Sequence, residues 1–226
     1  MDRLNLLKNI PIFSRLDKES LKRIDSISIE KYYKKGDIII LQDSTVEGLY
    51  IIREGRVKIS RISEDGKIKV LAILSSGDIM GEMSILDEES ASATAEAIEN
   101  SILIFINREG FRSILVRYPI ITLSIAQILA KRLRLADREI EELAFYSVKS
   151  RVIKMLIELA SKYGEKTDFG IKISLKLTHQ ELADMLGTSR ETVSRIMSAL
   201  EKRQLIVNEK GYIIIKDIDT LEDYIF

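Results

Sequence analysis

The sequence contains no cysteine and a single histidine, His179, among its 226 residues. The absence of cysteine excludes disulfides, thiolate metal sites and iron–sulfur clusters held by cysteine. One histidine is too few for a metal enzyme built on several imidazole ligands, and haem sensing usually needs histidine or cysteine. No paired nucleophile and base is visible in the sequence. We therefore expect no enzymatic activity, no metal and no cofactor.

The chain also lacks an excess of charge of either sign. Lysine and arginine together number 35, as do aspartate and glutamate, so the formal net charge is zero. Any affinity for nucleic acid must then come from a local patch of cations. No apolar run approaches the roughly 20 residues that span a membrane, and Met1–Leu16 mixes charges with short apolar runs, unlike a secretory signal. We expect a soluble, cytoplasmic protein without a membrane partner.

A stretch near the C-terminus contains two short helical patterns that meet at Gly187. Both open with the residue pattern of a capping box, Thr178 with Glu181 and Thr188 with Glu191. The small Ala183 where the helices would cross and the glycine at the turn predict a helix-turn-helix, whose second helix enters the DNA major groove. The apolar residues that recur at helical spacing are Leu182, Ala183 and Leu186, then Val193, Ile196, Met197 and Leu200.

The outward face of the second predicted helix carries the residues that would contact bases. Arg190 can donate two hydrogen bonds to a guanine edge, Glu191 can accept one from a cytosine amino group, and Arg195 can reach a second guanine or a phosphate. A solvated helix of mixed charge is the alternative interpretation. Because the turn, the caps and the apolar face agree, we interpret the stretch as a DNA reader.

Residues 148–226 are predicted to form one domain around this motif. Leu205–Val207 and Tyr212–Ile215 predict a hairpin, the wing beside the second helix, with Lys210 placed for a phosphate contact. The predicted DNA contacts are Thr178, His179, Ser189, Arg190, Glu191, Thr192, Arg195 and Lys210. The elements expected before the motif are a helix over Val152–Leu159, a polar connection over Tyr163–Gly170 and a strand over Ile171–Leu177.

The N-terminal half has a different pattern, in which short apolar runs are separated by glycine turns. Two short helices are expected first, over Leu4–Asn9 and Asp17–Ile24, with Asp17 as an N-cap and a stripe of Leu16, Leu21 and Ile24. Strands of this length joined by glycine turns indicate an antiparallel sandwich or roll. The apolar runs are Ile38–Leu41, Leu49–Ile52, Val57–Ile62, Ile68–Leu74 and Ser101–Ile106.

Tyr118–Ser147 predicts one long helix, with Pro119 at its start where a missing N–H costs least. An ordinary two-sided core helix is one interpretation; the charges on the rest of the surface favour a homodimer seam. A break in the pattern predicts a hinge over Phe145–Ser150. The seam residues, at coiled-coil spacing, are Ala126, Leu129, Leu133, Ala136, Ile140 and Leu143. The stripe expected to pack on the same subunit's roll is Ile121, Ile125, Ile128 and Leu135.

The glycine-punctuated motifs are K-K-G-D-I-I-I, L-Y-I-I-R-E-G-R-V-K-I, E-D-G-K and S-G-D-I-M-G-E-M-S-I-L. In this order they resemble the cyclic-nucleotide-binding roll. With the helix-turn-helix, the chain resembles transcription regulators of the cyclic-AMP receptor protein/fumarate-nitrate-reductase-regulator superfamily, from about Ile10 to about Ile215.

The resemblance implies an α+β fold in three parts. These are an antiparallel β-roll effector domain (a jelly roll) over residues 1–117, a dimerisation helix with its hinge over 118–147, and a winged helix-turn-helix over 148–226. It also implies a parallel homodimer, double-stranded DNA as a partner, RNA polymerase as a further partner, and palindromic sites whose half-sites resemble T-G-T-G-A.

In nucleotide-binding members, the loop that matches Gly81–Ala95 holds a cyclic phosphate. This chain has Ala91 where those members have arginine, and losing that contact should cost about 1.5–3 kcal/mol. Asp87, Glu88 and Glu89 precede it, and Ala136-Asp137 stand where a threonine–serine pair contacts adenine. We therefore expect that cyclic AMP is not the effector, and we interpret Gly81-Glu82 as a turn retained by the fold. The positions of the effector pocket are Gly81, Glu82, Met83, Ser84, Ala91, Ser92, Leu133, Ala136 and Asp137.

Three functions stay open at this point. The first is a transcription regulator gated by an unidentified apolar or anionic small molecule. The second is a constitutive regulator whose roll serves only as a dimerisation scaffold. The third is a cyclic-nucleotide-binding regulatory module of an enzyme complex, against which the outward Arg190, Glu191 and Arg195 argue. The sequence does not distinguish an activator from a repressor.

Overall fold

The computed structural model describes residues 3–225, and the chain divides into two compact units, residues 1–134 and 135–226. The division falls inside the long helix α5 (Pro119–Phe145). The other elements of the first unit are α1 (Arg3–Asn9), α2 (Lys18–Ser26), β1 (Ser28–Tyr33), β2 (Ile38–Ile40), β3 (Gly48–Glu54), β4 (Val57–Ile62), β5 (Ile68–Leu74), β6 (Ile79–Met80), α3 (Glu82–Leu86), β7 (Thr94–Ala97), β8 (Ser101–Asn107) and α4 (Arg108–Arg117).

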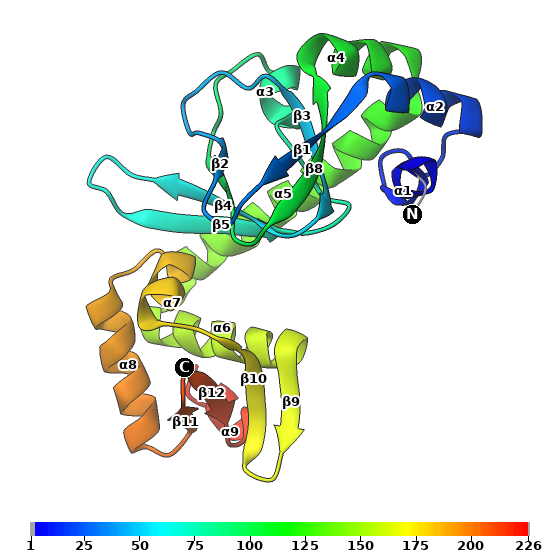
Figure 1. The fold of residues 1–226 in the computed structure, drawn as a ribbon. Helices are drawn as coiled ribbons and strands as arrows, with labels where there is room; N and C mark the ends of the chain where they lie inside the picture. Colours follow the sequence, from blue (N-terminus) through cyan, green and yellow to red (C-terminus); the bar gives the residue numbers. More distant parts are fainter. Residues whose placement is uncertain (1–2, 226) are drawn as a thin grey trace. The chain divides into compact units, whose positions relative to one another are not determined.

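Two four-stranded antiparallel sheets form the roll in the first unit (Figure 1), one in the order β1-β8-β3-β6 and the other in the order β2-β7-β4-β5. Alternation along the strands of the first sheet builds two cores, because successive side chains point to opposite faces. Tyr50, Ile52, Leu103 and Phe105 belong to the core that also contains Ile40 and Val57 of the second sheet. The neighbouring residues that pack with the helices instead are Leu49, Ile51, Ile104 and Ile106.

The predicted antiparallel roll is therefore confirmed, and so are the two short N-terminal helices. Asp17 caps α2 by accepting a hydrogen bond from the Ser20 amide at 2.7 Å, and Leu16, Leu21 and Ile24 are buried. Strands β1, β6 and β7 and helices α3 and α4 were not expected. Strands β6 and β7 and helix α3 have only two, four and five residues, too few for a periodic pattern to show. Helix α4 has buried Phe111 and Ile114 at helical spacing, a signal that was missed.

The long helix begins at Pro119 and ends at Phe145, within two residues of the predicted bounds. Ile121 and Ile125 are buried against the roll, as expected, and Ile128 is partly buried. The assignment of Leu135 to the same stripe was wrong, because its side chain is 55% exposed. Leu135 lies beyond the last turn of α5 that belongs to the first unit, so the stripe ends before it.

No single helix in the described part of the chain is long and apolar enough to cross a membrane. Helices α4 and α5, which meet at an angle of 108°, reach the required length and composition only when taken together. Core helices of soluble proteins can pass the same test, and Phe111, Ile114, Ile121 and Ile125 of this pair are buried in the core of the first unit.

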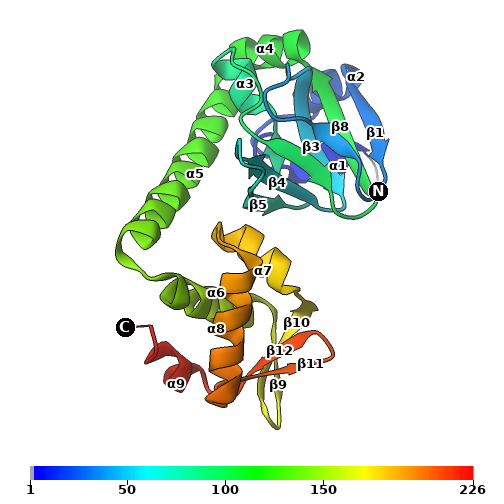
Figure 2. The same cartoon turned by 90° about the vertical axis from the view of Figure 1, so that its left-hand side faces the viewer.

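The second unit contains a four-stranded antiparallel sheet in the order β11-β12-β10-β9, shown with its helices in Figure 2. Its elements are α6 (Val148–Tyr163), β9 (Gly164–Thr167), β10 (Gly170–Lys176), α7 (His179–Leu186), α8 (Arg190–Lys202), β11 (Ile206–Glu209), β12 (Tyr212–Ile215) and α9 (Ile218–Glu222). Apolar side chains of α6, α7 and α8 and of strands β10 to β12 share one core.

Two expectations in this unit were wrong in part. The polar connection over Tyr163–Gly170 contains strand β9, whose polar residues pair with β10 at a sheet edge. All four residues of β9 are exposed, so the strand has no buried face and no alternation of apolar residues that would have predicted it. Helix α6 also begins earlier than Val152, at Val148, with Ser147 as its N-cap. The non-helical break between α5 and α6 is therefore confined to Tyr146 and Ser147.

Candidate functional site

Helices α7 and α8 meet at Gly187, as the sequence predicts. Gly187 adopts φ 65° and ψ 43°, the left-handed conformation that glycine tolerates best. The Thr178–Glu181 capping box at the start of α7 is present, with the Glu181 amide donating to the Thr178 hydroxyl at 3.1 Å. Leu182, Ala183 and Leu186 face the core, so the first helix is held by both its cap and its packing.

The predicted second capping box, Thr188 with Glu191, was wrong. Ser189 is the N-cap of α8, and its hydroxyl accepts from the Thr192 amide at 3.2 Å. The Thr188 amide instead donates to the Ala183 carbonyl at 3.0 Å, which makes Thr188 part of the end of α7. Because Thr188 is bonded to the end of α7, helix α8 is capped by Ser189 and starts one residue later than the pattern predicts.

Helix α8 separates its residues cleanly by face. Val193, Met197 and Leu200 are buried, whereas Arg190, Glu191 and Arg195 are exposed. Within residues 3–225 the structure records no ion pair or side-chain hydrogen bond for these three charged residues. At about 100° per residue, Glu191 and Arg195 lie almost opposite the buried face. Their polar groups are free to bind a ligand on that side, and the positive end of the helix dipole favours an anionic one.

The predicted hairpin is β11 and β12, joined by a turn at Lys210 and Gly211. Both residues have positive φ, 52° and 87°, as in the two-residue turns that suit a twisted hairpin. The Gly211 amide donates to the Asn208 side chain at 3.3 Å, which supports the turn. Lys210 is exposed at the tip of this wing.

Two lysines beside the wing were missed in the sequence. The amino groups of Lys172 and Lys176 lie 4.1 and 5.3 Å from the centre of the Tyr212 ring, a distance at which a cation and an aromatic face attract. Both lysines belong to β10, and because both amino groups approach the same ring, they lie on the same side of the sheet. The alternation K-I-S-L-K was the available signal.

Thr178 is the N-cap of α7, His179 begins that helix, and Thr192 belongs to α8. Thr178 is exposed, and His179 and Thr192 are partly exposed. In the described part of the chain no group of three or more His, Asp or Glu residues is arranged to hold a metal ion.

The roll contains the second set of predicted residues, beginning at Gly81 and Glu82. Gly81 has φ 86°, and a Cβ atom there would lie 2.6 Å from the Gly48 carbonyl oxygen, so only glycine fits. This supports our interpretation of a structural turn. Met83 is exposed and Ser84 is buried, with its hydroxyl donating to the Ser90 carbonyl at 3.3 Å.

Glu82 is only 1% exposed, and its partner is Arg132 of α5. One amino group of the guanidinium donates to Oε1 of Glu82, and the other donates to the Ile79 carbonyl at 2.7 Å. Oε2 of Glu82 has no hydrogen-bond partner among the described residues. Burial raises the pKa of Glu82, while Arg132 acts in the opposite direction by stabilising the carboxylate.

Arg132 was not among the predicted residues, although its neighbour Leu133 was. Leu133, Ala136 and Asp137 are all exposed. The contacts among Ile79, Glu82 and Arg132 join β6, α3 and α5 within the first unit. Only the folded structure brings residue 82 beside residue 132, so the pairing had no local signal in the sequence.

Ala91 stands where the resemblance implies an arginine in nucleotide-binding members, and its side chain, a single methyl group, is buried. Its backbone pairs with the 43–44 segment, donating to the Ser44 carbonyl at 2.9 Å and accepting from the Asp43 amide at 2.8 Å. Ser92 is exposed. Of the acids before it, Glu88 forms an ion pair with Arg112, so the negative field there is weaker than the sequence implied.

Two family models match the chain. A cyclic nucleotide-binding domain matches residues 30–118, and a Crp-like helix-turn-helix domain matches residues 150–224. The first match covers the roll together with α4, and the second covers most of the second unit.

Curated relatives match almost the full length. The cyclic AMP receptor protein of Thermus thermophilus is 33% identical over 220 residues, covering 97% of this chain and 99% of the relative. The anaerobic regulatory protein of Bacillus subtilis is 29% identical over 221 residues, covering 96% and 93%. A CRP-like cAMP-activated global transcriptional regulator of Mycobacterium tuberculosis is 31% identical over 189 residues, covering 84% of each.

Solved structures agree with these matches. A CooA mutant from Carboxydothermus hydrogenoformans superposes with a TM-score of 0.76 at 25% identity, covering 98% of this chain and 95% of that one. A CRP/FNR-family transcriptional regulator from Thermus thermophilus has a TM-score of 0.68 at 27% identity, covering 86% and 97%. With its roll, its long helix, its helix-turn-helix and its relatives, the chain belongs to the CRP/FNR family of DNA-binding transcription regulators.

Proposed function

We propose that this protein acts as a homodimer that binds a palindromic DNA site by placing one copy of α8 in each of two successive major grooves. The observation that carries this proposal is that Arg190, Glu191 and Arg195 of α8 are exposed, and no ion pair or side-chain hydrogen bond is recorded for them within residues 3–225. Such groups can bind base edges without first breaking internal contacts. The half-sites would lie about 34–36 Å apart and resemble T-G-T-G-A.

The surface of α5 supports the dimer. Leu133 and Ile140 are each 64% exposed, although both are apolar and recur at the spacing of a coiled-coil seam. The other seam positions fit the same face: Ala126, Ala136 and Leu143 are exposed and Leu129 is partly buried. A second copy of α5 would remove this apolar surface from water, at about 25 cal/mol for each Å² buried.

We infer that cyclic AMP does not control this protein, although two of the relatives are named for it. A buried methyl group at Ala91 offers no charge to a phosphate, and Glu82 already pairs with Arg132. Replacing a charge-assisted contact to phosphate by a methyl group costs about 1.5–3 kcal/mol.

The Glu82–Arg132 pair also favours the constitutive alternative, in which the roll is a scaffold. The chain's own guanidinium compensates the buried carboxylate and joins α3 to α5, so no effector atom is required for this contact. An effector would act only if it bound one state of the regulator more tightly than the other.

Fluorescence anisotropy with labelled duplexes tests these proposals. We expect tight binding to an inverted repeat of T-G-T-G-A and weaker binding to a scrambled duplex of the same length, with cyclic AMP making no difference. Equal affinity for both duplexes, at low salt, would contradict sequence-specific reading. A large gain on adding cyclic AMP would instead restore nucleotide control. Binding of cyclic AMP without binding of any duplex would favour the regulatory-module alternative.

A further inference from the structure

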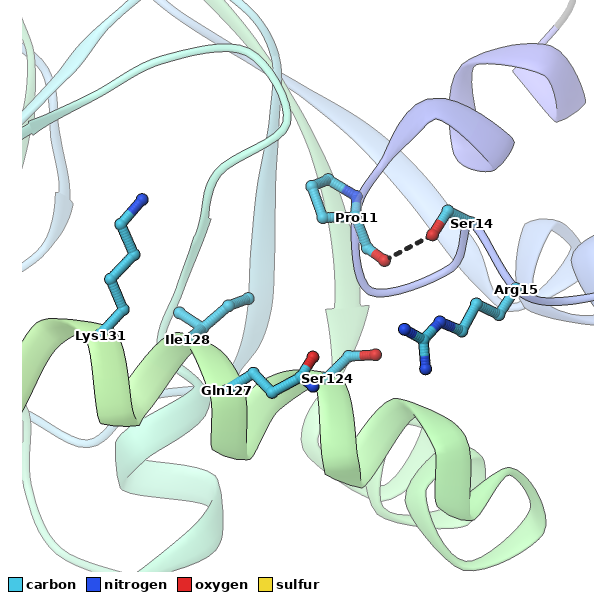
Figure 3. Close-up of a pocket in the computed structure, with 7 residues that line it drawn as sticks. All are labelled: Pro11, Ser14, Arg15, Ser124, Gln127, Ile128 and Lys131. Carbon is cyan, nitrogen blue, oxygen red and sulfur yellow. Dashed lines mark hydrogen bonds between the residues drawn. The ribbon is translucent and has the colours of Figure 1, made fainter.

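A cleft of about 290 Å³ lies in the first unit, between the α1–α2 connection and α5 (Figure 3). One wall consists of Pro11, Ser14 and Arg15. The other consists of Ser124, Gln127, Ile128 and Lys131, which share one face of α5 at helical spacing. The volume is near the lower end of small-molecule sites, roughly 300–1,000 Å³, so the cleft suits a ligand of only a few carbons.

Both walls are anchored by the core that lies behind them. Ile12, Phe13 and Leu16, the neighbours of the lining residues, are buried. The connection is also hydrogen-bonded, with the Phe13 amide donating to the Ile10 carbonyl at 2.9 Å and the Leu16 amide to the Phe13 carbonyl at 3.0 Å. On the other side, Ile121 and Ile125 hold α5. The cleft therefore keeps its shape, which lowers the entropy cost of binding.

The lining carries two cations and no acid, although the whole chain is neutral. Within residues 3–225 neither Arg15 nor Lys131 has a recorded ion pair or side-chain hydrogen bond. The two serine hydroxyls already donate, Ser14 to the Pro11 carbonyl at 2.9 Å and Ser124 to the Ile120 carbonyl at 3.0 Å. The donors left for a ligand are thus the two cations and the Gln127 amide.

The cleft faces away from the proposed dimer seam. At about 100° per residue, the mean direction of the four α5 lining residues is about 160° from that of the six seam residues around the helix. A second copy of α5 seated on the seam would leave the cleft open. The site is also separate from the roll residues around Glu82, because none of its lining residues comes from the strands or from α3.

We propose that this cleft binds a small organic dianion, with one anionic group on Arg15 and the other on Lys131. Figure 3 places these side chains at opposite ends of the row, with Gln127 and Ile128 between them. In Figure 3 Arg15 lies at the Ser124 end of the row. Because Ser124 and Lys131 are about 10 Å apart along the helix axis, the two anionic groups of this ligand would be separated by a carbon chain that lies over Ile128. The arginine fork suits a carboxylate or a phosphate.

Isothermal titration of the DNA-free full-length protein with succinate, adipate and inorganic phosphate tests this site. Butyrate serves as the monoanion control, at constant ionic strength. We expect saturable binding of at least one dicarboxylate with a Kd near or below about 1 mM, and at least tenfold weaker binding of butyrate. Phosphate binding as tight as that of the dicarboxylates would show that a single anion suffices and would overturn the two-ended site.

The variants Arg15→Gln and Lys131→Gln should each weaken dicarboxylate binding about tenfold or more. Lys22→Gln, which removes an exposed cation of α2 outside the cleft, should leave binding unchanged. Thermal unfolding of all three variants verifies that they fold. Absence of saturable dicarboxylate binding up to about 10 mM, or equal weakening by Lys22→Gln, would overturn the proposal. Because no DNA is present, failure here leaves the proposed DNA binding unaffected.

Discussion

Arg190 and Glu191 occupy the first turn of α8, where the helix is capped by Ser189 and backed by buried Val193. A guanidinium held on such a rigid base can make two parallel hydrogen bonds to one guanine, which a more mobile side chain would make at a greater cost in entropy. We therefore expect base preference to reside in individual residues, so that single substitutions can remove it.

The substitution Arg190→Ala should weaken binding to the inverted repeat by about 1–3 kcal/mol and relax the preference at one base pair of each half-site. Arg190→Lys is the matched control, because it keeps the charge and loses the planar fork. We expect Arg190→Lys to retain affinity for scrambled DNA while losing most of the preference. Anisotropy titrations against single-base variants of the site measure both. An unchanged preference in Arg190→Ala would show that Arg190 does not contact a base.

The buried carboxyl of Glu82 should make the stability of the protein depend on pH. Burial raises its pKa above the ordinary value of 4.5, so the native state holds this proton more tightly than the unfolded state does. Stability contributed in this way is present below pH 4.5 and is lost as pH rises through the raised native pKa. Glu82→Gln cannot titrate, so the corresponding fall should be absent from its profile. Urea unfolding of both proteins at a series of pH values above 4 measures this, and parallel profiles would contradict the assignment.

At the scale of elements, two neighbouring residues, Thr188 and Ser189, are both suitable N-caps for α8 by residue type, and the structure places Ser189 in that position. Ser189→Ala removes the hydroxyl that accepts from the Thr192 amide, so it should lower the free energy of unfolding by about 0.5–2 kcal/mol. Thr188→Ala is the control, because Thr188 does not cap the helix, and it should cost clearly less. Chemical unfolding of both variants gives the comparison. A larger loss for Thr188→Ala would show that α8 begins one residue earlier.

At the scale of the whole molecule, the proposed dimer seam on α5 predicts a link between dimerisation and DNA affinity. Two linked recognition helices bind a palindrome far more tightly than one, because the second contact is intramolecular. Leu133→Asp would place a charge from each subunit in the seam, so it should shift the protein to monomers and weaken palindrome binding by about 100-fold or more.

Leu135→Asp is the matched control for this prediction. Leu135 is also exposed on α5 but lies about 130° around the helix from the mean direction of the seam. Sedimentation velocity should find a dimer for Leu135→Asp and a monomer for Leu133→Asp. Full-affinity dimers of Leu133→Asp would refute the assignment of the seam.

Local patterns were sufficient for most of the elements that carry the candidate sites. The alternation of strands, the periodicity of α5 and α8, and Gly187 at the turn each depend on a few neighbouring residues, whose preferences act over a single turn or strand. The same locality explains the errors. Strand β9 is polar because it is an exposed sheet edge, and its existence depends on the pairing with β10.

What the sequence by itself determined is the order of roll, long helix and helix-turn-helix, and with it the family. Only the tertiary structure decided that Glu82 pairs with Arg132, that Ser189 rather than Thr188 caps α8, and that Arg15 and Lys131 line one cleft. Each of these depends on groups brought together by the packing of separate elements or on a one-residue difference at a turn. The spacing of apolar residues along the chain encodes neither the packing of distant elements nor the exact residue at which a turn ends.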